Sequence, residues 1–177
     1  MSTAFILIQS AAPMLRNLAA ILDKAEAHAQ ASGKSADDYV DARLAPDMFN
    51  LARQVQFACY GPTAGAGRLI GKLAVPPGDP DATFTAMKTR IAAAVAALEA
   101  MNAGDFAGAD DRDVVQPMQG TRVLEAKGLA YVRDWLMPNF YFHLVTAYDI
   151  LRNQGVDLSK RDYLGHIGPM IRDAAVA

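Results

Sequence analysis

Apolar side chains recur every three or four residues along most of the chain, which is the spacing of one face of an α-helix. The first such run covers residues 3–31 and predicts one long helix. Pro13 lies inside the run and predicts a kink, because proline cannot donate a main-chain hydrogen bond. Gly33 follows at the position where glycine commonly ends a helix.

A second helix is predicted to start at Pro46 and Asp47, since proline suits the first turn and a carboxylate favours the positive end of the helix dipole. Its apolar stripe resumes after the segment GPTAGAGR, where Pro62 and the glycines indicate a bend. This segment lacks the G-K-[ST] ending of a phosphate-binding loop and follows no strand, so a bent helix is the better interpretation.

A third helix is predicted from Asp81 or Thr83 to Gly104, because alanines favour helix and glycine ends it. Two short β-type runs follow at residues 114–115 and 121–124, and the segment QPMQG between them supplies turn residues. An isolated hairpin is only marginally stable, so we expect this one to lie on the helices.

The last main helix is predicted over residues 129–154, with a kink or break near Pro138. The tail after Gly155 is expected to be mostly loop, with at most a final helical turn. Four long antiparallel helices with a small β-hairpin before the last one predict an all-α protein, an antiparallel four-helix bundle in a single domain of residues 1–177.

The composition narrows the class of protein. Apolar residues make up 52% of the chain and charged residues 20%, which is typical of a globular domain. The net charge is −2 and no basic run occurs, so we expect no nucleic-acid partner. No stretch has the roughly 18 uninterrupted apolar residues of a membrane span. Cys59 is the only cysteine, and we expect a cytoplasmic protein without a disulfide or a membrane partner.

The most informative candidate for chemistry is His143, in the segment LMPNFYFHLVTAYDILRNQG. A metal site needs further ligands, yet Asn139 lies one helical turn before it and Ala147 one turn after. No H-x-x-x-H, H-E-x-x-H or E-x-x-H pair occurs in the sequence. We therefore predict a histidine of a pocket or core, without a metal or a cofactor.

A polar pocket could form between the second and the last predicted helices. Along one face of the second helix, Asp47 is followed by Asn50 or Leu51 and then by Gln54, which gives a polar row. If this row faces His143 and Asn139, it makes a site for a small molecule. Helix capping and ordinary surface polarity are the competing interpretation.

Other ligating or nucleophilic side chains have simpler interpretations. Cys59 lies in the apolar segment QFACYG, where a buried inert thiol is the default. Two aspartate clusters lack the spacing of an EF-hand loop and are expected in solvated loops. These clusters are Asp37, Asp38 and Asp41, and Asp110, Asp111 and Asp113.

Three consecutive aromatic residues, Phe140, Tyr141 and Phe142, cannot all face the same way, because successive helical residues turn by about 100°. At least one must therefore point to a second surface. That surface is a subunit interface, the hairpin or a pocket. We expect a homodimer, with Tyr141 as a candidate member of its interface.

The segments PNFYFHLVTAYDILRNQGVDLSKRDYLG and DMFNLARQVQFAC resemble a family of uncharacterised bacterial proteins within the DinB/YfiT-like helical-bundle superfamily. The resemblance covers nearly the whole chain, and P-N-F-Y-F-H is its most specific motif. It implies a four-helix bundle with a long crossover, often dimeric. Many members of the superfamily hold a divalent metal with three histidines, and some are thiol-dependent transferases.

Matched to that pattern, His143 stands at the second histidine of H-x-x-x-H, Asn139 stands at the first, and Gln54 replaces the histidine of the second helix. The resemblance thus implies a degenerate metal site. Our leading hypothesis is a helical bundle that binds a small ligand in a polar pocket. One alternative is a divergent metal-dependent transferase or hydrolase. The other is a structural protein that acts as a dimer.

Overall fold

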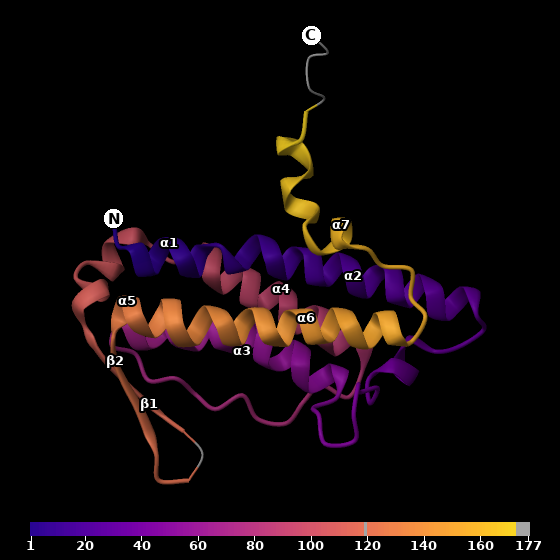
Figure 1. The fold of residues 1–177 in the computed structure, drawn as a ribbon, viewed down its shortest axis with the longest axis horizontal. Helices are drawn as coiled ribbons and strands as arrows, with labels where there is room; N and C mark the ends of the chain where they lie inside the picture. The colour runs from indigo at the N-terminus through magenta and orange to yellow at the C-terminus, as the bar shows by residue number, and fades with distance from the viewer. Residues whose placement is uncertain (119, 173–177) are drawn as a thin grey trace.

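The computed structural model describes residues 1–118 and 120–172, which form a mostly helical protein with one two-stranded hairpin (Figure 1). This coarse prediction is confirmed. The main elements are α1 (Thr3–Gln9), α2 (Ala11–Ala31), α3 (Leu51–Leu69), α4 (Phe84–Glu99), β1 (Asp113–Pro117), β2 (Val123–Lys127), α5 (Gly128–Ala130), η4 (Tyr131–Leu136), α6 (Met137–Asn153) and α7 (Lys160–Tyr163). Short 3₁₀ segments lie at Ala36–Tyr39 (η1), Ala103–Phe106 (η2), Ala109–Asp111 (η3) and Gly165–Met170 (η5).

The predicted first helix is interrupted at Ser10, which separates α1 from α2. Pro13 lies one turn later, and its ring nitrogen cannot donate to the carbonyl of Gln9. The Ser10 hydroxyl donates to the Leu7 carbonyl at 2.6 Å and closes the last turn of α1. The irregularity expected from Pro13 is therefore present as a break between two helices.

The stretch Thr3–Ala31 is long and apolar enough to cross a membrane by length and composition, and half of its most apolar window is buried inside the fold. Its buried side chains include Ile8, Leu15 and Leu22, all with no exposed surface. Because α2 packs along α4, this apolar face serves the protein interior. A core helix accounts for the hydropathy of the segment.

The predicted start of the second helix is wrong: α3 begins at Leu51, and Asp47 lies in the turn before it. Asn50 is the N-cap residue, and its side-chain oxygen accepts from the main-chain N–H of Arg53 at 3.0 Å. An asparagine in extended backbone satisfies an unpaired N–H of the first turn, so it outweighs the weaker signal of a proline. The helix then continues through Pro62 to Leu69.

The last main helix runs without a gap from α5 through η4 to α6. The segment η4 is π-helical and ends at Leu136, directly before Met137, and Pro138 is the second residue of α6. A π-helical turn holds an extra residue within an α-helix and often occurs at functional sites. The irregularity expected near Met137 is thus a change of helix type, and it rotates Tyr131 and Trp135 relative to α6.

The hairpin lies where it was predicted, before the last helix, and pairs β1 with β2 in antiparallel register. Val114 pairs with Ala126, and Gln116 pairs with Leu124. These four side chains are the less exposed positions of their strands, whereas Val115 and Glu125 are exposed. One face of the hairpin therefore covers the helices, as expected for a short two-stranded ribbon.

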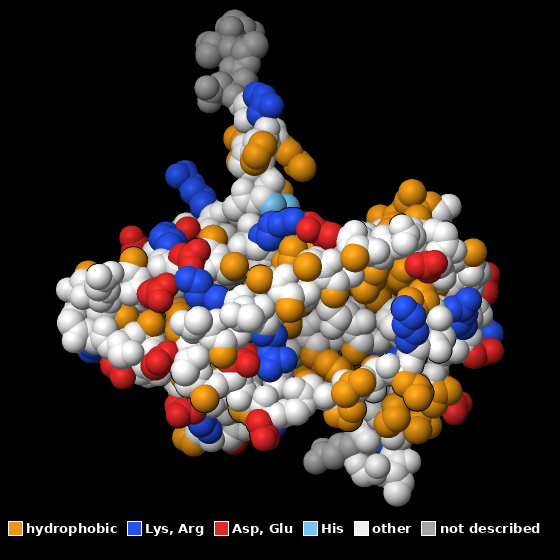
Figure 2. Space-filling view, turned by 180° about the vertical axis from the view of Figure 1, so that it is seen from behind, with side chains coloured by type: hydrophobic (Ala, Val, Ile, Leu, Met, Phe, Trp, Pro, Cys, Tyr) orange, Lys and Arg blue, Asp and Glu red, His pale blue; other side chains and the backbone are white. Residues whose placement is uncertain are grey.

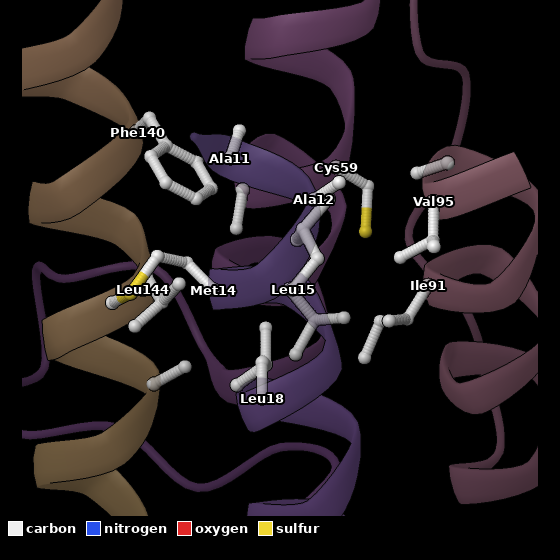
Figure 3. Close-up of a cluster of buried hydrophobic side chains, with 14 of the residues drawn as sticks. Ala11, Ala12, Met14, Leu15, Leu18, Cys59, Ile91, Val95, Phe140 and Leu144 are labelled. Atoms are coloured by element: carbon white, nitrogen blue, oxygen red, sulfur yellow. The ribbon is translucent and has the colours of Figure 1, made fainter. Parts of the chain in front are cut away.

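A cluster of buried hydrophobic side chains lies around α2, where α4 packs on one side and α6 approaches from another (Figure 3). Leu15, Leu18, Ile91 and Val95 belong to this cluster, and Cys59 of α3 points into it. At the C-terminal end, α7 packs on α2, and η5 then leads away from the helices (Figure 1). The predicted residues 173–177 of the tail lie outside the described residues.

Candidate functional site

A cavity of about 160 Å³ lies between α3, η4 and α6, with the inner face of β1 at one side. Its walls are mainly aromatic, and its polar groups are a histidine, two amides, two phenols, an indole and one guanidinium. The lining residues are Phe57, Tyr60, Gly61, Arg68, Gln116, Tyr131, Trp135, Leu136, Asn139, Phe140 and His143.

Two glycines of α3 shape this space. At Gly61, which lines the cavity, a Cβ atom would have no neighbour within 4 Å, so the missing side chain leaves open room. At Gly65, one turn later, a Cβ atom would overlap the side chain of Leu136. Gly65 therefore lets η4 approach α3 closely, and Gly61 keeps the space beside that contact empty.

The structure brings Gln54 and His143 together from positions 89 residues apart. Nδ1 of His143 lies 2.7 Å from Oε1 of Gln54, and Nε2 of Gln54 donates to the Phe49 carbonyl at 3.4 Å. The Phe49 carbonyl thus orients the Gln54 amide so that its oxygen faces the imidazole. Since that oxygen only accepts, Nδ1 of His143 carries the proton and donates it.

Burial lowers the pKa of His143 to about 4 from its ordinary 6.5, so the imidazole is neutral at pH 7. Its ring stacks on Phe57, with centroids 5.1 Å apart, and meets the edge of Phe142 at 5.4 Å. Every fully buried side-chain nitrogen or oxygen of the described residues has a hydrogen-bond partner, whereas Nε2 of His143 has none among these residues. Nε2 is therefore accessible and presents a lone pair that can accept a hydrogen bond.

Asn139 also lines the cavity, but its amide does not bond to His143. Its Nδ2 donates to the Trp135 carbonyl, one turn back, at 2.7 Å. This bond leaves Oδ1 of Asn139 as an acceptor beside the cavity. The expected pair of Asn139 and His143 therefore shares a wall without direct contact.

Sequence reasoning missed the opposite wall, where Tyr131, Gln116 and Arg68 meet. The Tyr131 hydroxyl donates to Oε1 of Gln116 at 2.7 Å, and burial raises the pKa of the Tyr131 phenol, which keeps it protonated. Arg68 reaches the hydroxyls of Tyr131 and Tyr60 at 3.5 Å. Nothing in the periodicity pointed to this cluster, because the hairpin supplies Gln116 and the π-helical segment places Tyr131.

Asp47 does not belong to the site: it is exposed and is absent from the cavity lining. The expected polar row fails because the helix begins at Leu51, which leaves Asp47 in the preceding turn. Asn50 is used as the cap, and its Nδ2 donates to Asp41 at 2.8 Å. Of the expected row, Gln54 alone reaches His143.

The remaining candidates have structural roles. Burial raises the pKa of Cys59 to about 12, so its thiol stays protonated among apolar side chains. Asp110 accepts from the Ser2 hydroxyl and from the N–H groups of Thr3 and Ala4, at 2.6 to 2.9 Å, and holds the start of α1. Asp37 likewise accepts from the N–H of Phe84 at 2.7 Å.

The side chains around His143 do not fit a divalent metal of the three-histidine type. Nδ1 of His143 is bonded to Gln54, and the Asn139 nitrogen to a carbonyl. The other imidazoles lie elsewhere: His28 contacts the Tyr39 hydroxyl and His166 contacts an asparagine. Within residues 1–118 and 120–172, no three His, Cys, Asp or Glu side chains are grouped closely enough to share an ion.

Comparison with known proteins places the chain in a family. A family model described as "Domain of unknown function (DUF1993)" matches residues 5–164. A crystal structure of a DinB family member protein from Shewanella denitrificans is 41% identical, with a TM-score of 0.82, and the match covers 91% of each chain. No curated protein matches the sequence. The resemblance inferred from P-N-F-Y-F-H is thus confirmed at the level of the family and its DinB-like fold.

Proposed function

The chain belongs to the DUF1993 family of DinB-like domains, and we propose that it binds a small organic molecule in the cavity beside His143, without a divalent metal. In this proposal the four long helices form an antiparallel four-helix bundle of the DinB/YfiT-like type. These helices are α2, α3, α4 and α6. The ligand lies between α3 and the π-helical segment that precedes α6.

The observation that carries the proposal is a hollow with polar groups that are already oriented. An engineered protein cavity of about 150 Å³ holds benzene, so this cavity, at about 160 Å³, has room for one ring. Binding sites are mostly apolar, with a few fixed polar groups that set the orientation of the ligand. Here Gln54 fixes the tautomer of His143, and Nε2 is left to accept a hydrogen bond from the ligand.

A solution measurement with phenol tests this proposal. Phenol has a single ring and one donor for Nε2 of His143, and the upper bound on binding energy per non-hydrogen atom allows roughly millimolar affinity for a ligand of that size. We expect calorimetry to detect it with the unmodified protein and not with Gly61→Leu, whose side chain fills the cavity. Gly67→Leu is the matched control in the same helix, because Gly67 does not line the cavity. Equal affinity in Gly61→Leu would contradict the proposal.

The alternative of a metal-dependent transferase or hydrolase is tested by adding Zn²⁺. The proposal predicts no stoichiometric binding at His143, because its Nδ1 is engaged and it has no second imidazole beside it. Metal analysis of tag-free protein and of His143→Ala gives the answer. One bound ion per chain, lost in His143→Ala, would favour the metal-dependent enzyme.

A second role as a dimer has its own support. Phe142 is 57% exposed on α6, and Tyr141 and Val145 are 37% exposed beside it. Apolar side chains grouped on one helix face are typical of an interface, and a second copy of the chain is the partner we propose. Light scattering should show a dimer that Phe142→Glu or Tyr141→Glu separates. An unchanged mass would remove this face as the interface.

A further inference from the structure

We infer that the ligand of this cavity is a single-ring aromatic carboxylate, whose ring lies among the aromatic walls and whose carboxylate binds Arg68. The inference rests on the proposed function, since it names the chemical class of the molecule that the cavity holds. Three observations lead to it: an unpaired guanidinium, its place at the mouth of the cavity, and the nature of the walls.

Arg68 is the one charged side chain among the residues that line the cavity. Its hydrogen-bond partners in the described part of the chain are the hydroxyls of Tyr60 and Tyr131, both at the long distance of 3.5 Å. No carboxylate of the described residues lies within salt-bridge distance of it. Most of its five donors are therefore free, in a geometry that matches a carboxylate.

Arg68 and Tyr60 also line a second, outer groove of about 570 Å³, between residues 71–77 and β1. Figure 2, which views the molecule from behind, shows hydrophobic side chains gathered around this hairpin end. Because two residues belong to both linings, Arg68 lies at the boundary between the cavity and the groove. An anionic group bound there points outward, and the apolar part of the ligand points into the cavity.

One wall of that groove is held in place from α3. Gln56 is fully buried, and its Nε2 donates to the carbonyls of Pro77 and Asp79 at 3.0 and 2.7 Å. Arg53 donates to Oε1 of Gln56 at 2.7 Å and to the Gly78 carbonyl at 3.0 Å. The entrance beside Arg68 is therefore bordered by a tethered segment, which favours a ligand of defined shape.

The walls select for a flat ring. Five aromatic side chains surround a volume that matches one six-membered ring. They are Phe57, Tyr60, Tyr131, Trp135 and Phe140. The attraction between two aromatic rings stabilises a complex by more than the burial of their apolar surface alone. An aliphatic acid of equal length would fill the space without this gain.

Calorimetry with benzoate and benzamide tests the inference, because the two have the same shape and differ in charge. We expect benzoate to bind the unmodified protein about tenfold more tightly or better, the range of a charge-assisted hydrogen bond. Arg68→Gln should abolish this preference, measured as the ratio of benzoate to benzamide affinity within that variant. Lys72→Gln is the control, because Lys72 lines the outer groove but not the cavity. This variant should keep the preference for benzoate within about twofold of that of the unmodified protein.

Several results would overturn the inference. If benzoate and benzamide bind equally and both are lost in Gly61→Leu, the cavity binds a ligand but Arg68 does not select its charge. If neither they nor phenol binds, the proposed function fails as well. A preference lost in Lys72→Gln, and kept in Arg68→Gln, would place the carboxylate in the outer groove. Equal binding of cyclohexanecarboxylate would remove the selection for an aromatic ring, which we expect to be about threefold or more.

Discussion

The two sides of α3 face two different interiors. On one side, Cys59 points into a close-packed apolar cluster with Leu15, Ile91 and Val95 (Figure 3). On the other, Gly61 and His143 border a cavity, and Gln54 of α3 accepts a hydrogen bond from His143. The first side supplies stability, because dense packing removes apolar surface from water. The second side is less closely packed and contains buried polar groups. Natural proteins tolerate such a loss of stability at functional sites.

The largest effect is expected on the packed side, with Leu15→Ala. Leu15 has no exposed surface and does not line the cavity, so truncation leaves a new void and costs about 2–5 kcal/mol of unfolding free energy. Denaturant unfolding measures this loss, and phenol affinity should not change. Leu73→Ala is the control, since Leu73 is 98% exposed. A small loss at Leu15 would mean that the two interiors do not differ in packing.

A smaller effect is expected on the polar side, with Gln54→Met. Methionine keeps the bulk of Gln54 but cannot accept the proton of His143 Nδ1 or donate to the Phe49 carbonyl. The polar groups left without partners cost about 1–3 kcal/mol. Thermal unfolding would show the lower stability, and calorimetry would show weaker phenol binding because the tautomer is no longer fixed. Unchanged phenol affinity would argue against a role for the Gln54–His143 pair in the site.

The two glycines of α3 should respond in opposite directions. Gly61→Ala adds a methyl group in open space within a helix and should stabilise the protein by about 0.5–1 kcal/mol. Gly65→Ala displaces Leu136 and should destabilise it by about 1–2 kcal/mol, since overpacking outweighs the gain in helix propensity. Paired thermal melts measure both. Destabilisation by Gly61→Ala would mean that the space beside Gly61 is not open, and stabilisation by Gly65→Ala would mean that Leu136 does not pack tightly against Gly65.

The smallest of these effects is expected from a change of pH near neutrality. The folded protein protonates His143 near pH 4, whereas the unfolded chain does so near 6.5. Between these values the unfolded state binds more protons, so the unfolding free energy falls as the pH drops from about 6.5 to 4 and does not change above 6.5 on this account. The difference between the unmodified protein and His143→Gln isolates this contribution from other groups. An excess unfolding free energy of the unmodified protein over His143→Gln that stays constant, or decreases, as the pH rises from 4 to 6.5 would contradict a buried neutral imidazole.

The regular elements could be predicted from the sequence because each follows from local periodicity and turn residues. The hairpin before the last helix, the irregularity at Pro138 and the contact surfaces of residues 140–142 all follow from such local rules. Phe140 is buried whereas Phe142 is exposed, as the helical turn angle requires. The dimer that we associate with this surface stays a proposal.

The site was less predictable, because it depends on choices between competing signals and on long-range placement. Pro46 and Asn50 both mark a helix start, and the cap formed by Asn50 moved Asp47 out of the helix. The π-helical segment changes which residues face α3, so Tyr131 reaches Gln116 of the hairpin. Arg68 gained its importance from the absence of a carboxylate nearby within the described residues, which no local pattern reveals.

The most direct test of a ligand cavity beside His143 is an NMR titration of isotope-labelled protein with phenol. We predict saturable shifts of the Gly61 amide, the Trp135 indole N–H and the Asn139 side-chain amide, all of which line the cavity. Shifts confined to residues outside the cavity lining, or no shift at these three groups, would contradict an organic ligand at this site.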